Sequence, residues 1–305
     1  MQNGQQLHVL STVWVDETPS VRVRVDGGDS TVIPLAALTL RYSLEGSARR
    51  RCIGHKPFRD RAVSWIDCNS PPLPQSLTCD RCAANDAAFA AQLHHAHQRG
   101  RGELDSAVLA HLDKPNSLYL AAFRDGSIKV GTSTKPRLQT RLAEQGAWRA
   151  VIAANATDGF AVRTLEDRVT AEIGLPQSVA IGRKLAGLEQ PKTDEWLESE
   201  LSRWQAAVAG LIERLADPRL SSANTLWVTP CDDDSRWKSV HRYPRRLDSG
   251  SHDLEVLGAS GRAVLARRPS GIDHFAADLR QLYRILIDTS DDVTPDELTV
   301  QDSLF

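Results

Sequence analysis

Four cysteines between positions 52 and 82 are the residues of this sequence best suited to chemistry. Cys79 and Cys82 form a CxxC pair, and two thiolates separated by two residues can bind one tetrahedral metal ion. Cys52 and Cys68 would complete a set of four sulfur ligands with metal–sulfur distances of about 2.3 Å. Four protein ligands leave no open position for a reacting water, so the spacing predicts a structural zinc site. His55 is the competing ligand if one of the cysteines is not used.

Two other interpretations of these cysteines remain open. The first is a set of buried free thiols without metal, and the second is a redox-active CxxC pair, against which the two further cysteines argue. In a reducing compartment, clustered cysteines bind metal more often than they form disulfides. No apolar run reaches the ~18 residues of a membrane span, and the N-terminus lacks a signal sequence. We therefore expect a soluble, cytoplasmic protein without a membrane partner.

The middle of the chain has the clearest pattern of secondary structure. Two strands flank Asp125-Gly126, which is typical of a two-residue hairpin turn. A helix, a strand and a second helix follow, and Gly146 ends the first helix. The expected elements are strands 116–123 and 127–133, helix 136–145, strand 148–156 and helix 157–174. The sequence thus predicts a small core with the order β-β-α-β-α.

The flanking regions supply the rest of an α+β fold. Residues 1–48 include alternating stretches such as SVRVRVD between turn residues, which predicts a β-rich module. A helix is expected over 86–112, and a longer one over 193–215 with Trp196 and Trp204 in the core. LEVLGASGRAVLAR predicts a β-hairpin. The expected divisions are a β-rich zinc-binding module at 1–85, the core at 86–185, a helical and β-hairpin region at 186–287 and a mobile acidic tail at 288–305.

Two short motifs in the core resemble the paired motif of the GIY-YIG nuclease superfamily. SLY at 117–119 corresponds to the first motif, and KVG at 129–131 corresponds to the second. The superfamily carries an arginine on the next helix, for which Arg141 and Arg137 are the candidates. It carries a glutamate on the following helix, which Glu166 in RTLEDRV matches. An uncharacterised family that joins a cysteine cluster to YLA, KVG and R…R…EQGA resembles the chain more closely, over most of its length.

The resemblance implies a metal-dependent endonuclease that hydrolyses phosphodiester bonds. In that scheme Tyr119 is the general base for the attacking water, and Arg141, with Arg137, stabilises the charge that develops on the phosphate. Glu166 holds a catalytic Mg²⁺ or Mn²⁺ ion. The substrate would be a nucleic acid, with DNA the expected one.

Lys129 stands where the second motif of the superfamily has a tyrosine. It follows Tyr119 by ten residues across the expected two-residue turn, so we expect the two side chains to face each other on neighbouring strands. A nearby ammonium group favours a phenolate and lowers the pKa of a tyrosine from about 10. The substitution either preserves base catalysis by this route or marks a loss of activity. The alternative function is therefore an inactive nucleic-acid-binding or protein-binding module on the same fold, and a small-molecule enzyme is a third.

The overall charge is close to neutral. The chain has 37 Lys and Arg residues and 39 Asp and Glu residues, a net charge of −2. This excludes a uniformly basic nucleic-acid coat. Because phosphate neutralisation supplies much of the affinity for DNA, binding would need a local basic surface. The candidates for that surface are Arg49, Arg50, Arg51, Lys135, Arg137 and Arg141.

The last five residues, QDSLF, resemble the short peptide by which proteins bind the bacterial sliding clamp. In that pattern a glutamine is followed by two variable residues, a leucine and a phenylalanine, which correspond here to Gln301, Leu304 and Phe305. Leu304 and Phe305 can fill a hydrophobic pocket while Gln301 forms directional hydrogen bonds. The acidic, proline-interrupted stretch before them predicts a mobile tail that is free to bind a partner.

Overall fold

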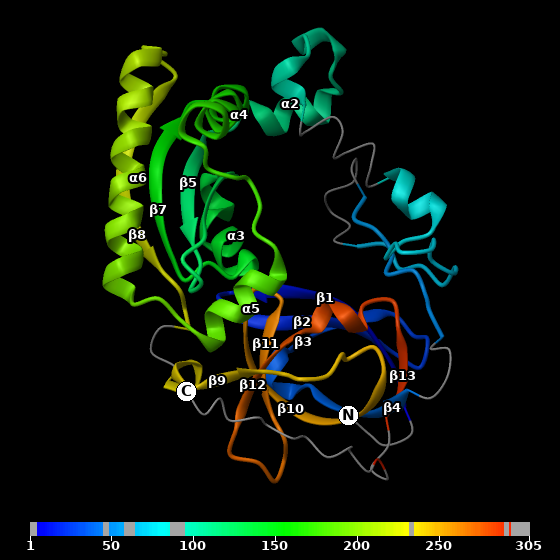
Figure 1. Cartoon of the computed structure of the whole chain (residues 1–305). Helices are drawn as coiled ribbons and strands as arrows, with labels where there is room; N and C mark the ends of the chain where they lie inside the picture. The colour runs from blue at the N-terminus through cyan, green and yellow to red at the C-terminus, as the bar shows by residue number, and fades with distance from the viewer. Residues whose placement is uncertain are drawn as a thin grey trace. The chain divides into compact units, whose positions relative to one another are not determined.

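The computed structural model describes residues 5–44, 49–57, 65–85, 95–231, 235–289 and 293, and the chain forms two compact units (Figure 1). Unit 1 contains Met1–Lys56, Val63–Ala83 and Ser235–Phe305, and unit 2 contains Pro57–Ala62 and Ala84–Asp234. Both ends of the chain therefore belong to one unit, and the middle of the chain forms the other. The combination of helices with several mainly antiparallel sheets confirms the expected α+β class.

The two units differ from the four consecutive regions that the sequence predicted. The expected region 186–287 is divided at residue 235, because its last part belongs with the N-terminal strands. The cause is pairing between strands that are far apart in the sequence. β13 (Leu286–Asp288) pairs with β1 (Gln6–Val15), and β10 (Gly250–Ser260) pairs with β4 (Thr39–Leu44).

Unit 1 contains two sheets that share one hydrophobic core. Sheet 1 has the order β13-β1-β2-β3, with β2 at Thr18–Val25 and β3 at Ser30–Pro34. Sheet 2 has the order β4-β10-β11-β12-β9, with β11 at Ala263–Arg267, β12 at His274–Asp278 and β9 at Val240–Arg242. Neighbouring strands are antiparallel except β12 and β9, and the hairpin β10–β11 is the one that the sequence predicted.

The alternating sequence of β2 gives sheet 1 two different faces. Val21 and Val23 lie in the hydrophobic core, and Arg22 and Arg24, which alternate with them along the strand, point to the other face. Both arginines are nevertheless buried, because the segments that carry Cys52 and Cys68 cover this face. Arg22 Nη2 donates a hydrogen bond to the carbonyl of Ile53 at 3.1 Å, and Arg24 Nη1 donates to the carbonyl of Cys68 at 3.3 Å.

Asp67 supplies the negative charge that these arginines need. Its Oδ1 lies 3.2 Å from Arg22 Nη1 and 3.4 Å from Arg24 Nη2. The ring of Trp65 lies 3.7 Å from Cζ of Arg22, which adds a cation–π contact. Because a buried charge without its partner is strongly destabilising, these contacts fix the cysteine-bearing segment on sheet 1.

Unit 2 is built around sheet 3, an antiparallel sheet with the order β6-β5-β7-β8. Its elements, in chain order, are α2 (Ser106–Leu112), β5 (Asn116–Ala122), β6 (Ile128–Thr134), α3 (Leu138–Gln145), β7 (Arg149–Ala156), α4 (Gly159–Arg168), α5 (Ile181–Glu189), α6 (Asp194–Leu215) and β8 (Leu220–Val228). From β5 to α4 they follow the predicted order β-β-α-β-α. The sequence analysis did not predict α5 or β8.

The ends of these helices follow from local sequence. The side chain of Asp158 accepts a hydrogen bond from Ala161 N at 2.8 Å and so caps the start of α4. Gly146 has a φ of 68°, a left-handed conformation that ends α3 as expected. Thr193 caps the predicted long helix α6, which runs along β7 and β8 (Figure 1). Its expected core tryptophans do not lie in the core: Trp196 is 40% exposed and Trp204 is half-buried.

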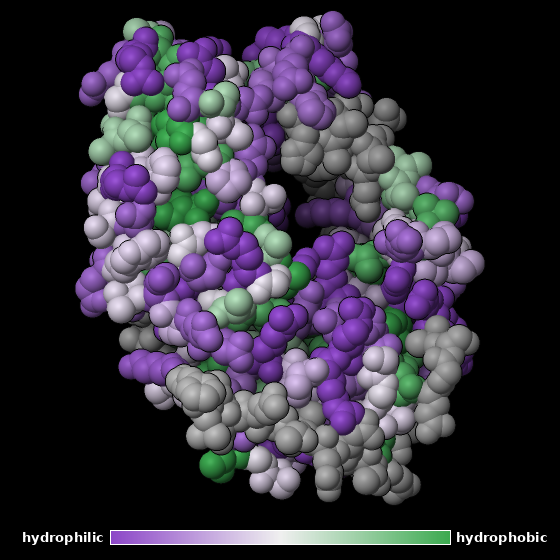
Figure 2. Space-filling model, in the orientation of Figure 1, coloured by the Kyte–Doolittle hydropathy of each residue, from purple (hydrophilic) through white to green (hydrophobic). Residues whose placement is uncertain are grey.

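Of the expected helix over 86–112, the described residues form an α-helix only at the C-terminal end. Residues 86–94 lie outside the described part of the chain, and 3-10 turns occupy Ala96–Gln98 and Arg101–Glu103 before α2 begins. The sequence RGRG at 99–102 explains the interruption, since glycine is a poor helix former. Within the described residues, no helix is both long enough and apolar enough to span a bilayer. The face drawn in Figure 2 is mainly hydrophilic, with apolar residues in small separate patches.

Candidate functional site

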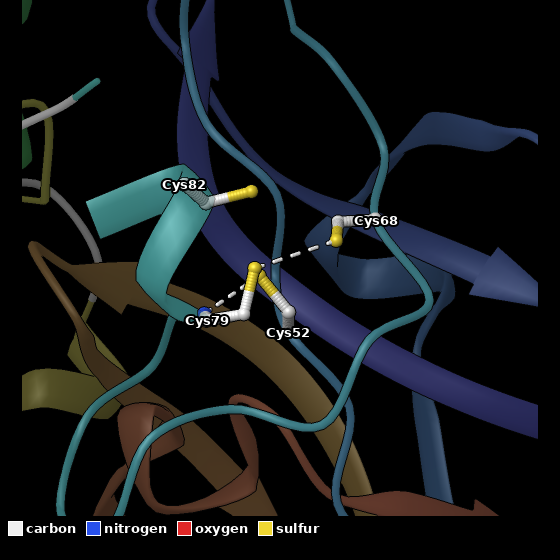
Figure 3. A group of neighbouring side chains, drawn as sticks. All are labelled: Cys52, Cys68, Cys79 and Cys82. Carbon is white, nitrogen blue, oxygen red and sulfur yellow. Dashed lines mark hydrogen bonds between the residues drawn. The ribbon is translucent and has the colours of Figure 1, made fainter. Parts of the chain in front are cut away.

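The four predicted cysteine ligands converge in unit 1. The sulfur atoms of Cys52, Cys68, Cys79 and Cys82 all lie within 4.8 Å of one another, and all four residues are buried. Figure 3 shows the side chains pointing toward one another, with Cys79 and Cys82 at a helical turn and the other two on neighbouring loop segments. The group can hold a metal ion such as zinc, and it contains the two cysteines outside the CxxC pair, as the sequence predicted.

Backbone geometry positions these sulfur atoms. The backbone N–H groups of Cys79 and Gly54 donate hydrogen bonds to Cys52 Sγ, at 3.2 and 3.4 Å. Gly54 has a φ of 82°, and a Cβ at this position would lie 2.1 Å from the carbonyl oxygen of Ile66, so the loop requires glycine here. His55, the competing ligand, is not a member of the group of four sulfur atoms. It lies next to that group, with Nδ1 3.2 Å from Cys82 Sγ.

One pair of sulfur atoms has the separation expected around a tetrahedral ion. A tetrahedron with zinc–sulfur bonds of about 2.3 Å has edges of about 3.8 Å. The sulfur atoms of Cys68 and Cys79 are 3.8 Å apart. Burial raises the pKa of the Cys52 and Cys82 thiols, so a cation at the centre would supply the charge that stabilises their thiolates.

A second group of side chains converges in unit 2, at one face of sheet 3. Tyr119 comes from β5, Lys129 from β6, Arg141 from α3 and Glu166 from α4. Nζ of Lys129 lies 5.9 Å from the centre of the Tyr119 ring, and the side chain of Arg141 interacts with the Tyr119 hydroxyl. Glu166 interacts electrostatically with both Lys129 and Tyr119. We call these four side chains the central cluster.

The hairpin turn decides which residues share this face. The backbone N–H of Phe123 donates to the carbonyl of Ser127 at 2.9 Å, which closes a loop of three residues, 124–126. The sequence predicted a loop of two. Gly126 N donates to the carbonyl of Phe123 at 2.8 Å, and the φ of Gly126 is 87°. A glycine in this conformation is typical of the last position of a three-residue hairpin loop.

The resulting register pairs Tyr119 with Gly131, and Lys129 with Ala121. Tyr119 and Lys129 therefore lie on the same face of neighbouring strands, as expected, and they are diagonal neighbours. The Tyr119 ring lies over Gly131, where a Cβ would come within 2.5 Å of both Cζ and the hydroxyl oxygen. The glycine of the KVG motif is thus required by the position of the tyrosine.

The predicted lowering of the Tyr119 pKa is also wrong. Burial raises the pKa of Tyr119, although Arg141 and a hydrogen bond from Gln145 oppose this shift. Burial, together with the positive charge of Arg141, lowers the pKa of Lys129 to about 8. Burial raises the pKa of Glu166, opposed mainly by Arg163 and Lys129. The cluster thus combines a phenol that burial keeps protonated with an amine whose pKa is lowered to about 8.

Three further residues complete the surroundings of the central cluster. Gln145 Nε2 donates to the Tyr119 hydroxyl at 2.7 Å, and Thr132 Oγ1 donates to Glu166 Oε2 at 3.3 Å. Arg163 lies one helical turn before Glu166 on α4. Two of these residues lie in or next to the motifs of the sequence: Gln145 belongs to the EQGA stretch, and Thr132 follows KVG.

Other predicted residues do not join the central cluster or cannot be placed. Arg137 Nη2 pairs with Glu144 Oε2 at 2.9 Å on the exposed side of α3. Arg49 in unit 1 pairs with Asp288 at 3.0 Å. The tail residues Gln301, Leu304 and Phe305 lie outside the described residues.

Comparisons with protein-family models, with curated proteins and with solved structures find no match to this chain.

The sulfur geometry predicts that zinc binding requires the four clustered cysteines and does not require Cys231. We expect about one zinc per chain in the purified protein, and loss of that zinc in Cys82→Ser after dialysis against a chelator. In Cys82→Ser, the free energy of unfolding of unit 1 should fall by at least about 2 kcal/mol, since a metal bound only by the folded state stabilises that state. Cys231→Ser is the matched control, because Cys231 is buried in unit 2. Elemental analysis that finds no zinc, or equal zinc in Cys82→Ser, would contradict the assignment.

The contact between Tyr119 and Gly131 predicts a cost for the smallest possible substitution. Gly131→Ala should lower the free energy of unfolding by about 1–3 kcal/mol, because the added methyl group must displace the buried ring. Gly182→Ala is the control, since a Cβ at that α5 position meets nothing within 4 Å. Urea unfolding of the three proteins measures the difference. Equal stability of Gly131→Ala and the wild type would show that the ring does not occupy this position.

Proposed function

We propose that unit 2 is a metal-dependent phosphodiesterase that hydrolyses nucleic acid, with chemistry like that of the GIY-YIG nucleases, and that the cysteine site of unit 1 is a structural zinc site. The observation that carries the proposal is the convergence of the central cluster from four different elements. Tyr119, Arg141 and Glu166 are each of the type, and on the element, that the resemblance implies, and Lys129 takes the position of the second motif tyrosine. A chance similarity of short motifs would give no reason for Arg141 and Glu166 to approach the same tyrosine.

The roles follow from charge and exposure. Arg141 is exposed and lies beside the Tyr119 hydroxyl, so it can contact a phosphate and stabilise the charge that develops on it. Glu166 would hold a Mg²⁺ or Mn²⁺ ion, and this ion would supply Lewis-acid stabilisation of the phosphate and the leaving oxygen. Neighbouring Arg163 and Lys129 favour the charged form of Glu166.

Lys129, next to Tyr119, is the proposed proton acceptor for the attacking water. A general base works best when its pKa lies near the working pH, and the pKa of Lys129 is about 8. The neutral amine of Lys129 therefore suits this role better than the buried phenol. Tyr119, fixed by Gln145, would orient the water and the amine. The substitution of lysine for the second motif tyrosine is thus compatible with catalysis.

A binding module without cleavage is the second candidate function. It is favoured by the burial of Tyr119, which is 1% exposed, and of Lys129, which is 7% exposed. Burial limits the access of an attacking water to both side chains. In that case Arg141 would contribute a phosphate contact, and the remaining polar residues would serve the fold. None of the five cysteines forms a disulfide, which suits the cytoplasmic location proposed for either function.

Cleavage of a nucleic acid by the full chain tests the proposal. The wild type should nick DNA or RNA in the presence of Mg²⁺ or Mn²⁺, and Glu166→Gln should reduce the rate at least ~100-fold, because it removes the proposed metal ligand. Glu172→Gln is the matched control. Glu172 follows α4, is exposed and pairs with Arg168 and Arg214 away from the central cluster.

The assay separates three outcomes. Activity in the wild type and Glu172→Gln but not in Glu166→Gln supports the phosphodiesterase. Equal activity in all three proteins would assign the cleavage to a contaminant or another site. Nucleic-acid binding without cleavage would favour the binding module.

The tail also carries a proposed partner, the bacterial sliding clamp, which Gln301, Leu304 and Phe305 would bind. We expect a peptide of residues 291–305 to bind the purified clamp with a dissociation constant of about 1–10 μM, because a short peptide loses conformational entropy on binding. The same peptide with Leu304→Ala and Phe305→Ala should lose most of this affinity. Isothermal titration measures both, and equal binding of the two peptides would remove the clamp as a partner.

A further inference from the structure

Unit 2 contains a cavity of about 350 Å³ that is not part of the central cluster. It lies between the start of β6, the loop at 174–180, and helices α5 and α6. Its volume is in the range of small-ligand pockets, roughly 300–1,000 Å³. The side chains that bear on ligand chemistry are those of Arg183, Glu200 and Trp204.

The loop at 174–180 separates this cavity from Lys129 of the central cluster. The carbonyl of Pro176 accepts a hydrogen bond from Val130 N at 2.9 Å, and the carbonyl of Gln177 accepts one from Lys129 Nζ at 3.2 Å. Leu175, Pro176 and Ser178 of the same loop line the cavity. The cavity and Lys129 of the central cluster therefore contact the same loop.

The lining offers three complementary kinds of contact. Trp204 provides an indole ring; the Arg203 guanidinium lies over one face of it, with Cζ 4.4 Å from the ring centre, so a flat heteroaromatic group would stack on the other face. Glu200 accepts a hydrogen bond from Arg203, and a carboxylate has further lone pairs for an amino donor. Arg183 pairs with Asp125 through Nε, and its guanidinium has two other nitrogens that can donate to a phosphate. A stacking ring, an acceptor and a cation together match a nucleotide better than an acyl chain or a simple anion.

We propose that this cavity binds the base of a nucleotide, with Trp204 as the stacking surface and Glu200 as the acceptor for an exocyclic amino group. The proposal rests on the proposed function, since it assigns the cavity to a nucleotide that flanks the reacting phosphate. Adenine, cytosine and guanine carry such an amino group. Uracil and thymine present a carbonyl oxygen there, which a carboxylate repels. The cavity thus confers a preference for amino-bearing bases.

The experiment is an isothermal titration of the full chain with AMP, UMP and inorganic phosphate. We expect AMP to bind at least 10-fold more tightly than UMP, and inorganic phosphate to bind more weakly than either. Trp204→Ala should weaken AMP binding at least 10-fold, because base stacking on an aromatic side chain is lost. Glu200→Gln should remove the preference for AMP over UMP.

Trp196→Ala is the matched control on the same helix, since Trp196 is exposed and does not line the cavity. It should bind AMP like the wild type. No binding of AMP, equal binding of AMP and inorganic phosphate, or equal affinities in Trp204→Ala and the wild type would overturn the assignment. The titration requires no cleavage, so a chain that binds AMP but cleaves nothing refutes the proposed reaction and supports the cavity.

Discussion

The packing of Tyr119 over Gly131 is the contact on which the central cluster depends. A phenol ring that lies directly over the neighbouring strand needs a residue without a side chain beneath it, and a Cβ at this point would overlap the ring. With the ring held there, its hydroxyl meets Gln145 and Arg141 from α3, while Lys129 and Glu166 approach from β6 and α4. The burial that makes this arrangement rigid also keeps the phenol protonated and lowers the pKa of Lys129.

Unit 1 depends on a different constraint, the burial of two arginines on one face of sheet 1. Arg22 and Arg24 would be strongly destabilising without the carbonyl groups and the Asp67 carboxylate that reach them from the cysteine-bearing segment. The described residues of that segment have little regular structure, so an internal connection would hold its loops together. A metal ion bound by the four sulfur atoms would provide such a connection, and the arginine contacts would then fix the resulting module on the sheet.

The sequence predicted local features better than long-range ones. The alternation in β2, the end of α3 at Gly146 and the CxxC spacing are set by neighbouring residues, and each corresponds to an observed element or cluster. The pairing of β13 with β1 is not visible in any local pattern, which explains why the predicted boundaries differ from the two units. The pair Asp125-Gly126 predicts a two-residue turn, whereas the observed turn has three residues and ends at Gly126. That difference of one residue decides which side chains accompany Tyr119 on its face, and burial, which sequence alone does not give, decides the pKa values there.

A crystal structure with Mn²⁺ and a non-hydrolysable oligonucleotide tests the central claim most directly, since the anomalous signal of manganese locates the ion. The account predicts one Mn²⁺ ion at the Glu166 carboxylate, with a phosphate of the oligonucleotide between that ion and the Arg141 guanidinium, on the face of sheet 3 that carries Tyr119 and Lys129. An oligonucleotide bound elsewhere on the chain, or an ion that does not contact Glu166, would contradict it.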